Sequence, residues 1–224
     1  MNKLDHVAFI MDGNGRWGKK RGKGRNFGHF TGVKVVKKIV ESSIKQKVPI
    51  VTFYVFSTEN WKRPKSEIKF LFNLIKSYFL DELKNVIENG IKINIIGDIK
   101  KLPTNLSKIL LETTSKTKNN KKILVNLALN YGSRDEIGRA IKLIRKKKKI
   151  SQKIISQNLY TKNLPDPDIL IRTGGKKRLS NFMLWQLAYT ELYFIDKLWP
   201  DLKKRDLEKI IIHYKKIKRN FGNI

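Results

Sequence analysis

The sequence contains no cysteine, few acidic residues and no long apolar run. Without cysteine the chain can form no disulfide and no thiolate metal site, which is compatible with an intracellular, cytoplasmic setting. No stretch approaches the roughly 20 continuous apolar residues that a membrane span needs. The first residues run directly into a strand pattern, so we expect no signal peptide. No repeat or linker is evident, and we expect one domain over residues 1–224.

The charge balance is strongly basic. Lysine and arginine number 49 against 19 aspartates and glutamates, which leaves a formal net charge of +30. Such an excess indicates polyanionic partners, namely nucleic acid, an anionic membrane or phosphorylated substrates. A run such as residues 146–149 is also typical of an ordinary solvated face. Composition alone leaves these alternatives open, including peripheral contact with the inner face of a membrane.

Strand and helix patterns alternate along the chain. Runs such as residues 50–55 are apolar almost throughout, as in strands covered on both faces, and their alternation with helices predicts one mostly parallel sheet flanked by helices. The expected strands are 6–11, 50–56, 91–96, 123–129, 168–172 and 191–195. The expected helices are about 29–46, 66–89, 104–118, 133–147, 151–160, 180–188 and 203–219. Gly90 is placed to end a helix, and Ser133 with Glu136 has the spacing of a capping box.

The stretch from Val7 to Lys19 is the most informative part of the sequence. Its apolar run ends at Asp12, and three glycines follow within six residues. We interpret it as a buried strand that leads into a flexible, cationic loop. Glycines let backbone N–H groups converge on a phosphate, and Asp12 could hold Mg²⁺ against it. A nucleotide P-loop fits less well, because Lys20 stands where that motif needs Ser or Thr. An ordinary strand-to-helix turn would explain the glycines alone.

Three predicted loops carry arginine beside small polar residues. They are residues 12–25, 57–64 and 172–181, which follow the first, second and fifth strands. Because the carboxyl ends of parallel strands share one edge of a sheet, we expect these loops to meet. The planar fork of arginine binds phosphate oxygens in pairs, so the loops predict a site for two phosphorylated groups. Ser180 would cap the helix 180–188, whose N-terminus favours anions. Three separately solvated loops are the alternative.

Several blocks, in order, resemble the signature of the cis-prenyltransferases. The blocks are HVAFIMDGNGRW (6–17), GH (28–29), FSTENWKRP (56–64), NYG (130–132), DILIRTGG (168–175), RLSNF (178–182), WQ (185–186), ELYF (191–194) and WP (199–200). They span nearly the whole chain and most resemble the bacterial undecaprenyl diphosphate synthases. A nucleic-acid-binding domain would explain the charge, but no such motif is present and Asp12 and Glu191 would be unusual in its groove. Another class of phosphate-binding enzyme would explain the loops but not the blocks.

The resemblance implies a Mg²⁺-dependent transferase. Such an enzyme condenses isopentenyl diphosphate repeatedly onto an allylic diphosphate such as farnesyl diphosphate, with cis double bonds. The implied product is a long polyprenyl diphosphate, here undecaprenyl diphosphate for the lipid carrier of cell-wall synthesis. The resemblance also implies a homodimer, a six-stranded sheet of non-Rossmann type and no nucleic acid partner.

The resemblance also assigns roles to individual residues. Asp12 matches the essential acid that holds Mg²⁺, and Glu191 matches a second acidic residue of the metal site. Asn60 matches the proton acceptor; because a neutral amide is a poor base, we expect it to orient a water or the diphosphate. The residues that match the allylic diphosphate site are Gly13, Asn14, Gly15, Arg16, Arg25 and His29, with Trp17 and Trp61 beside the apolar ends of the substrates. Those of the closing loop and the isopentenyl diphosphate site are Ser57, Thr58, Glu59, Arg63, Arg172, Arg178, Leu179 and Ser180. A purely structural role for His29 is equally open.

The helix pattern at 66–89 is more apolar than a core face requires. Its stripe is Ile68, Leu71, Phe72, Ile75, Phe79 and Leu83, widened by Phe70, Leu74 and Tyr78. Core packing and a dimer interface are the ordinary explanations. With prenyl chemistry, one wall of a tunnel for the growing chain is favoured, and strand 91–96 would form the opposite wall.

The sequence departs from the family pattern at three places. Lys176 replaces the family's Glu after RTGG, and the segment 145–166 is shorter than in bacterial members. Asn220 stands at the arginine of a C-terminal Arg-x-Gly, which leaves open whether Arg219 replaces it. Product length depends on how side chains pack in the tunnel, so the sequence does not give it.

Overall fold

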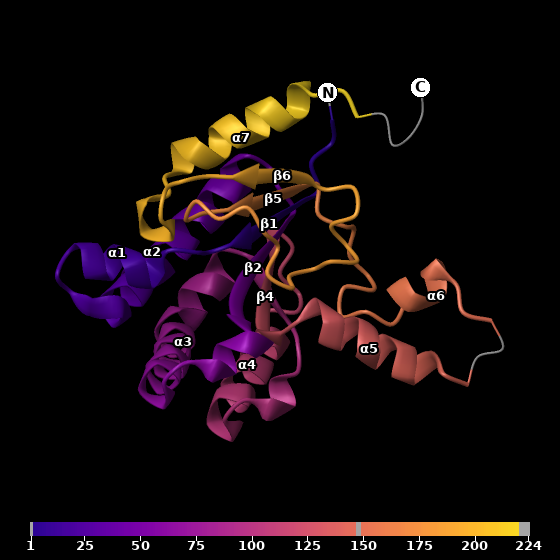
Figure 1. Cartoon of the computed structure of the whole chain (residues 1–224), viewed down its shortest axis with the longest axis horizontal. Helices are drawn as coiled ribbons and strands as arrows, with labels where there is room; N and C mark the ends of the chain where they lie inside the picture. The colour runs from indigo at the N-terminus through magenta and orange to yellow at the C-terminus, as the bar shows by residue number, and fades with distance from the viewer. Residues whose placement is uncertain (1, 147–148, 220–224) are drawn as a thin grey trace.

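A six-stranded parallel sheet forms the centre of the molecule (Figure 1). The computed structural model describes residues 2–146 and 149–219. The strands are β1 (His6–Ile10), β2 (Ile50–Ser57), β3 (Ile91–Ile96), β4 (Ile123–Tyr131), β5 (Ile169–Arg172) and β6 (Glu191–Phe194), in the order β3-β4-β2-β1-β5-β6. Every pairing between these strands is parallel, which confirms the predicted α/β class and sheet.

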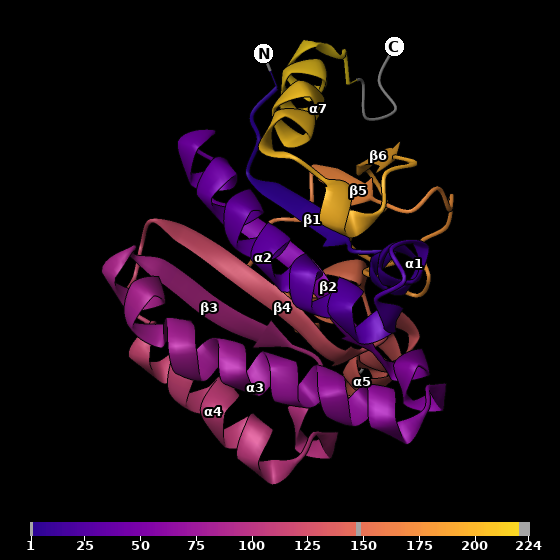
Figure 2. The ribbon, with the colours of Figure 1, turned by 90° about the vertical axis from the view of Figure 1, so that its left-hand side faces the viewer.

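Helices and turns cover both faces of this sheet. On one face, Phe9 and Phe53 stack with ring centroids 5.0 Å apart inside the larger core cluster. The helices of that face are α2 (Gly24–Lys45), α3 (Lys65–Glu88), α4 (Thr104–Lys116) and α7 (Lys204–Lys216). Figure 2 shows α2 and α3 side by side across the sheet. On the other face, Ala8 and Leu170 pack under the segment 179–187, on the side of α5 (Ser133–Ile144) and α6 (Gln152–Ser156). Covering on both faces explains the continuous apolar strands.

The segment after β1 is not the flexible loop that the sequence predicted. β1 ends at Ile10, a short helix α1 (Asn14–Lys20) follows, and α2 begins at Gly24 rather than at residue 29. A Cβ atom on Gly28 would lie 1.8 Å from the backbone oxygen of Asn14. The glycine therefore allows α1 and α2 to pack closely, a role that the phosphate-loop interpretation did not include.

Residues 180–188 form consecutive turns instead of the predicted helix. Ser180, Asn181 and Met183 have positive φ angles of 52°, 62° and 47°, which a right-handed helix does not contain. Ser180 therefore caps no helix, and the helix N-terminus expected there to favour anions is absent from the described residues.

Other local expectations are adjusted by packing. The capping box is wrong, because Gly132 precedes α5 and the Glu136 carboxylate instead accepts a hydrogen bond from the buried Tyr131 hydroxyl at 2.6 Å. Gly90 does follow α3 with a φ of 65°, as predicted. The helices α5, α6 and α7 are shorter than their sequence patterns. Residue 147 and Asn220 lie outside the described residues. No helix in the described ranges combines the length and apolarity of a membrane span.

His6 gives the fold a predictable response to acid. It is fully buried on β1, with Nδ1 2.8 Å from the Pro165 carbonyl oxygen and Nε2 2.7 Å from the Thr52 hydroxyl. Burial lowers its pKa from 6.5 to about 4. Between these two pH values the unfolded chain binds a proton at His6 that the folded chain does not. The free energy of unfolding is therefore highest, with respect to this group, above pH 6.5, and it falls as the pH decreases towards 4.

We expect this response in denaturant unfolding at pH 7 and at pH 4.5. The free energy of unfolding should fall by about 2 kcal/mol more for the wild-type chain than for His6→Gln, which cannot take up the proton. Other titrating groups, His29 among them, are present in both chains and cancel in the comparison. An equal fall in both would mean that His6 is protonated in the folded state.

Candidate active site

The carboxyl ends of β2, β1 and β5, which are neighbours in the sheet, open into one cavity of about 600 Å³. The residues that line it are Ile10, Met11, Asp12, Asn14, His29, Tyr54, Val55, Ser57, Glu59, Asn60, Arg63, Leu71, Arg172, Arg178, Ser180 and Asn181. All three predicted loops contribute to this list. The expectation that they meet at one edge of the sheet is confirmed.

Asp12 is held between two arginines at the end of β1. Its Oδ2 accepts a hydrogen bond from Arg172 Nη2 at 3.0 Å, and its Oδ1 accepts one from Arg16 Nη2 at 3.2 Å. Its backbone oxygen accepts from the Thr173 hydroxyl at 2.7 Å and from the Trp199 N–H at 3.0 Å. The backbone is therefore fixed, while 29% of the carboxylate side chain is exposed to the cavity and solvent. This is an oriented and still accessible acid.

Arg172 is buried and organises the third loop. Besides Asp12, its guanidinium donates to the Ser180 hydroxyl at 2.8 Å and to the Arg178 carbonyl oxygen. Its Nε has no hydrogen-bond partner among the described residues although it is buried. These bonds hold the turn that contains Ser180 against β5. The exposed side chain of Arg178 is thereby presented to the cavity without an ion-pair partner in the described part of the chain.

Glu67 of α3, absent from the predicted site, organises the opposite wall. Its two oxygens each accept a hydrogen bond from Arg25 at 3.0 Å, and Oε1 also accepts from Arg63 at 3.1 Å. The hydrogen bonds from Arg25 lower the Glu67 pKa, so the carboxylate is charged at neutral pH. Because only 8% of Glu67 is exposed, its carboxylate interacts mainly with these arginines and little with solvent. The signal in the sequence was its position four residues after Arg63, at the start of a helix.

His29 is neutral in this site. Burial, together with the charge of Arg63, lowers its pKa to about 4. Its Nε2 lies 3.5 Å from Glu67 Oε1 but makes no hydrogen bond among the described residues. A neutral imidazole with one buried, unpaired nitrogen therefore faces the cavity.

The loop after β2 is connected to its neighbours by amide side chains. Asn60 lies in the 3₁₀ turn Thr58–Lys62 and lines the cavity, while its Oδ1 accepts a hydrogen bond from the Ser57 backbone at 3.1 Å. Asn181 Nδ2 donates to Glu59 Oε1 at 2.8 Å, which joins the second loop to the third. Asn60 therefore stabilises its own turn through Oδ1. Its Nδ2 makes no hydrogen bond to the described residues.

Other predicted residues surround the cavity without lining it. Gly13 precedes α1 as its N-cap residue with a φ of 110°, and Gly15 leaves room for Arg25, whose Nη1 would lie 2.7 Å from a Cβ there. Arg16 is bound to Asp12 and to the Gly174 carbonyl oxygen at 2.8 Å.

The side chains of four predicted residues make their contacts outside the cavity. Trp17 donates to Asp201 at 2.7 Å, Trp61 donates to Asn130 at 2.8 Å, the Thr58 hydroxyl contacts Asp135 at 3.2 Å, and Leu179 packs against the core of the second face. None of these four is among the residues that line the cavity.

Glu191 is not brought together with Asp12. It begins β6, where it pairs with Ile169, which in turn pairs with Val7 of β1. Asp12 lies at the opposite end of the strands, roughly 16 Å further along at about 3.3 Å per residue. The carboxylate of Glu191 instead lies 3.6 Å from Arg219 Nε. Because Glu191 is the first residue of β6 and Asp12 follows the last residue of β1, the two acids do not share an ion within one chain.

An apolar corridor leads away from the cavity between α2 and α3. Met11, Asn14, His29, Val55 and Leu71 line both the cavity and a narrow pocket of about 110 Å³. That pocket shares the side chains Val36, Tyr78, Phe79 and Leu127 with a further one of about 100 Å³, whose lining includes Ile91 and Ile93 of β3. Both α3 and β3 therefore line the corridor, where the tunnel walls were expected.

Comparison with known proteins identifies the relatives of this chain. Residues 10–222 match the family model described as "Putative undecaprenyl diphosphate synthase". An isoprenyl transferase of Oceanobacillus iheyensis is 46% identical over 231 residues, which cover 100% of this chain and 92% of the relative. One from Clostridium tetani is also 46% identical, over 98% of this chain and 89% of the relative.

Two solved structures are also similar. Lavandulyl diphosphate synthase from Lavandula x intermedia, in complex with dimethylallyl diphosphate, has a TM-score of 0.94 and 33% identity, with 98% of each chain covered. A probable undecaprenyl diphosphate synthase from Campylobacter jejuni has a TM-score of 0.85 and 38% identity, with 100% of each chain covered.

Proposed function

Because this chain belongs to the undecaprenyl diphosphate synthase family of isoprenyl transferases, we propose that it elongates an allylic diphosphate with isopentenyl diphosphate in a Mg²⁺-dependent reaction. The observation that carries the proposal is the junction of two environments. A cavity rimmed by arginines shares part of its wall with an apolar corridor. A prenyl diphosphate has the same two parts, an anionic head and a hydrocarbon tail.

The wall built around Glu67 is proposed to receive the allylic diphosphate. Arg25 and Arg63 converge there, Arg16 lies beside Asp12, and the corridor begins at His29. Guanidinium groups bind diphosphate oxygens in pairs. The lavender relative is described in complex with dimethylallyl diphosphate, which supports an allylic diphosphate as ligand. Farnesyl diphosphate is the proposed primer because its longer tail would occupy the corridor.

The third loop is proposed to receive isopentenyl diphosphate. Arg178 is exposed to the cavity and has no carboxylate partner among the described residues, so it is available to a phosphate. Arg172 is already bonded to Asp12 and Ser180, and we assign it the positioning of this loop and of Asp12. The Ser180 hydroxyl, which lines the cavity, would contribute a hydrogen bond.

The donor set around Asp12 fits magnesium bound together with a diphosphate. No group of three or more acidic or histidine residues in the described ranges could hold a metal ion on its own. Mg²⁺ commonly uses one or two carboxylates and takes its other oxygens from phosphates and water. Asp12 supplies one such carboxylate. When bound, the ion would neutralise the charge of the departing diphosphate.

The protein's own groups are proposed to act on charge and on one proton. The arginines stabilise the diphosphate more strongly as its negative charge increases, which lowers the barrier to breaking the allylic carbon–oxygen bond. Formation of the new carbon–carbon bond leaves a proton to be removed. Asn60 would orient a water or the leaving diphosphate to accept it, because its amide is a poor base.

Labelled isopentenyl diphosphate, farnesyl diphosphate and Mg²⁺, incubated with the purified chain, test the proposal. We expect polyprenyl diphosphates with many added five-carbon units, and we propose undecaprenyl diphosphate as the main product. Omission of the primer or chelation of Mg²⁺ should abolish the product. Absence of incorporation, or a single condensation only, would contradict chain elongation. We further propose that the chain forms a homodimer, contacts the inner face of the membrane and supplies the lipid carrier of cell-wall synthesis.

A further inference from the structure

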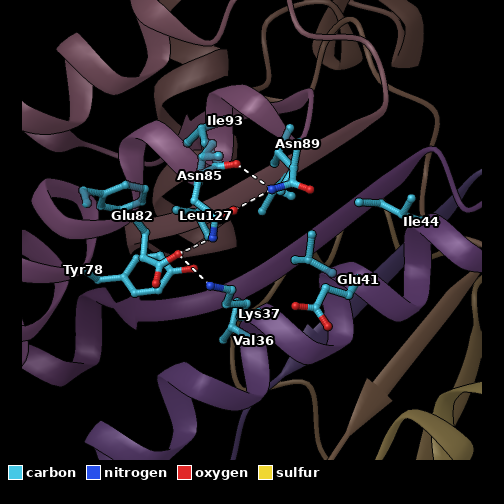
Figure 3. A pocket seen from close by; sticks show the side chains of 15 residues that line it. Val36, Lys37, Glu41, Ile44, Tyr78, Glu82, Asn85, Asn89, Ile93 and Leu127 are labelled. Atoms are coloured by element: carbon cyan, nitrogen blue, oxygen red, sulfur yellow. Dashed lines mark hydrogen bonds and ion pairs between the residues drawn. The ribbon is translucent and has the colours of Figure 1, made fainter.

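A polar network lies along the apolar corridor, between α2 and α3 (Figure 3). Lys37 of α2 points toward Glu82 of α3, with Nζ 2.8 Å from Oε2. Asn85 Nδ2 donates to the same carboxylate oxygen at 2.6 Å, and Asn89 Nδ2 donates to Asn85 Oδ1 at 2.6 Å. The other carboxylate of this pocket, Glu41, is paired instead with Lys204 at 2.7 Å.

The Lys37–Glu82 pair separates the corridor from the surface. Both side chains line the inner pocket together with apolar residues such as Phe79 and Ile93. Both also line an outer groove between α2 and α3, beside Lys38 and Asp81, which line only that groove. The pair is therefore a bridge between two helices, with hydrocarbon on one side and water on the other.

This position would oppose a growing hydrocarbon chain. The side chains of Lys37 and Glu82 are 41% and 29% exposed, so water still solvates part of each charge. A prenyl tail that advanced past the bridge would replace this water with hydrocarbon or would separate the two charges. Either change carries a desolvation cost that the preceding apolar segment of the corridor does not impose.

We propose that the network of Lys37, Glu82 and Asn85 forms a polar wall of the corridor that limits how far the growing chain extends and thereby determines product length. The inference rests on the proposed function, since it assigns a role in the specificity of that reaction. These three residues are specificity-determining rather than catalytic, because they lie along the corridor and not at the reacting diphosphates. A brace that only joined α2 to α3 would affect stability without affecting product length.

The test is the distribution of products from the double variant Lys37→Met/Glu82→Leu, which makes this wall of the corridor apolar. We expect the main product to lengthen by at least one five-carbon unit, with total isopentenyl incorporation within about threefold of wild type. The matched controls are Lys38→Met and Asp81→Leu, on the same two helices but facing only the outer groove. They should give the wild-type distribution.

A charge swap separates the ionic bridge from side-chain volume. Lys37→Glu/Glu82→Lys restores an ion pair between α2 and α3, and it should restore the wild-type product length. If the double variant does not fold, Asn85→Leu is the substitute test, because it leaves both charges in place. It should also lengthen the product. Unchanged products in a folded apolar variant, with or without a lower melting temperature, would overturn the inference. If wild-type chain makes no polyprenyl product, the proposed function itself has failed.

Discussion

Replacing Asp12 by alanine should lower the rate of prenyl transfer by roughly 10³-fold, the scale of losing a group that stabilises developing charge. Asp12 is the only carboxylate directly after β1, and two arginines orient it. Removal of its charge would take away the proposed magnesium ligand and one of the two contacts that hold Arg16. Asp12→Asn keeps the shape and loses the charge, so it should be nearly as inactive.

The same variants should remain folded. Asp12 pairs with the buried Arg172, so some stability is lost, but Arg172 keeps its bonds to Ser180 and to the Arg178 carbonyl oxygen. We expect a loss of about 1 kcal/mol in the free energy of unfolding. Asp206→Asn is the control, because Asp206 pairs with Lys197 and does not line the cavity. If Asp12→Asn retains most of its Mg²⁺-dependent rate, the assigned role of Asp12 is wrong.

The sheet and the meeting of its loops could be predicted because they depend on residue types that recur in pattern. Six apolar strands separated by helices leave a parallel sheet as the simple solution, and the carboxyl ends of β1, β2 and β5 then form one edge. Asp12 and Arg172 could be placed from this rule alone. The metal assignment of Glu191 came from resemblance, and its position at the start of β6 does not follow the same rule.

The features that the sequence analysis did not predict depend on contacts between segments that are distant in sequence. The turns at 180–188 follow from the bonds that Arg172 makes to Ser180 and to the Arg178 carbonyl oxygen, which no local propensity encodes. α1 was not predicted because glycines have a low helix propensity, yet they are required where α1 packs against α2. Glu67 looked like an ordinary polar position at the start of a helix, and only the fold shows that Arg25 reaches it.

Glu67→Gln should give the second large loss of activity, about 10²-fold in kcat/KM for the allylic diphosphate. The glutamine keeps the size of the side chain but replaces one acceptor oxygen with an NH₂ group, which faces the guanidinium donors of Arg25 and Arg63. Arg25 then loses its paired hydrogen bonds, and both arginines lose the charge that orients them. The loss corresponds to about 2.7 kcal/mol at about 1.36 kcal/mol per tenfold change.

The pattern of the kinetic change identifies the site that Glu67 supports. KM for the allylic diphosphate should rise more than KM for isopentenyl diphosphate, because Arg178 and Ser180 make no described contact with Glu67. Glu112→Gln is the matched control: it also removes a glutamate charge paired to a cation four residues away, Lys116 at 2.6 Å, but on the exposed surface of α4. Steady-state kinetics with each substrate varied in turn measures both constants. If Glu67→Gln is as active as Glu112→Gln, or raises both KM values equally, then Glu67 does not position the arginines of an allylic diphosphate site.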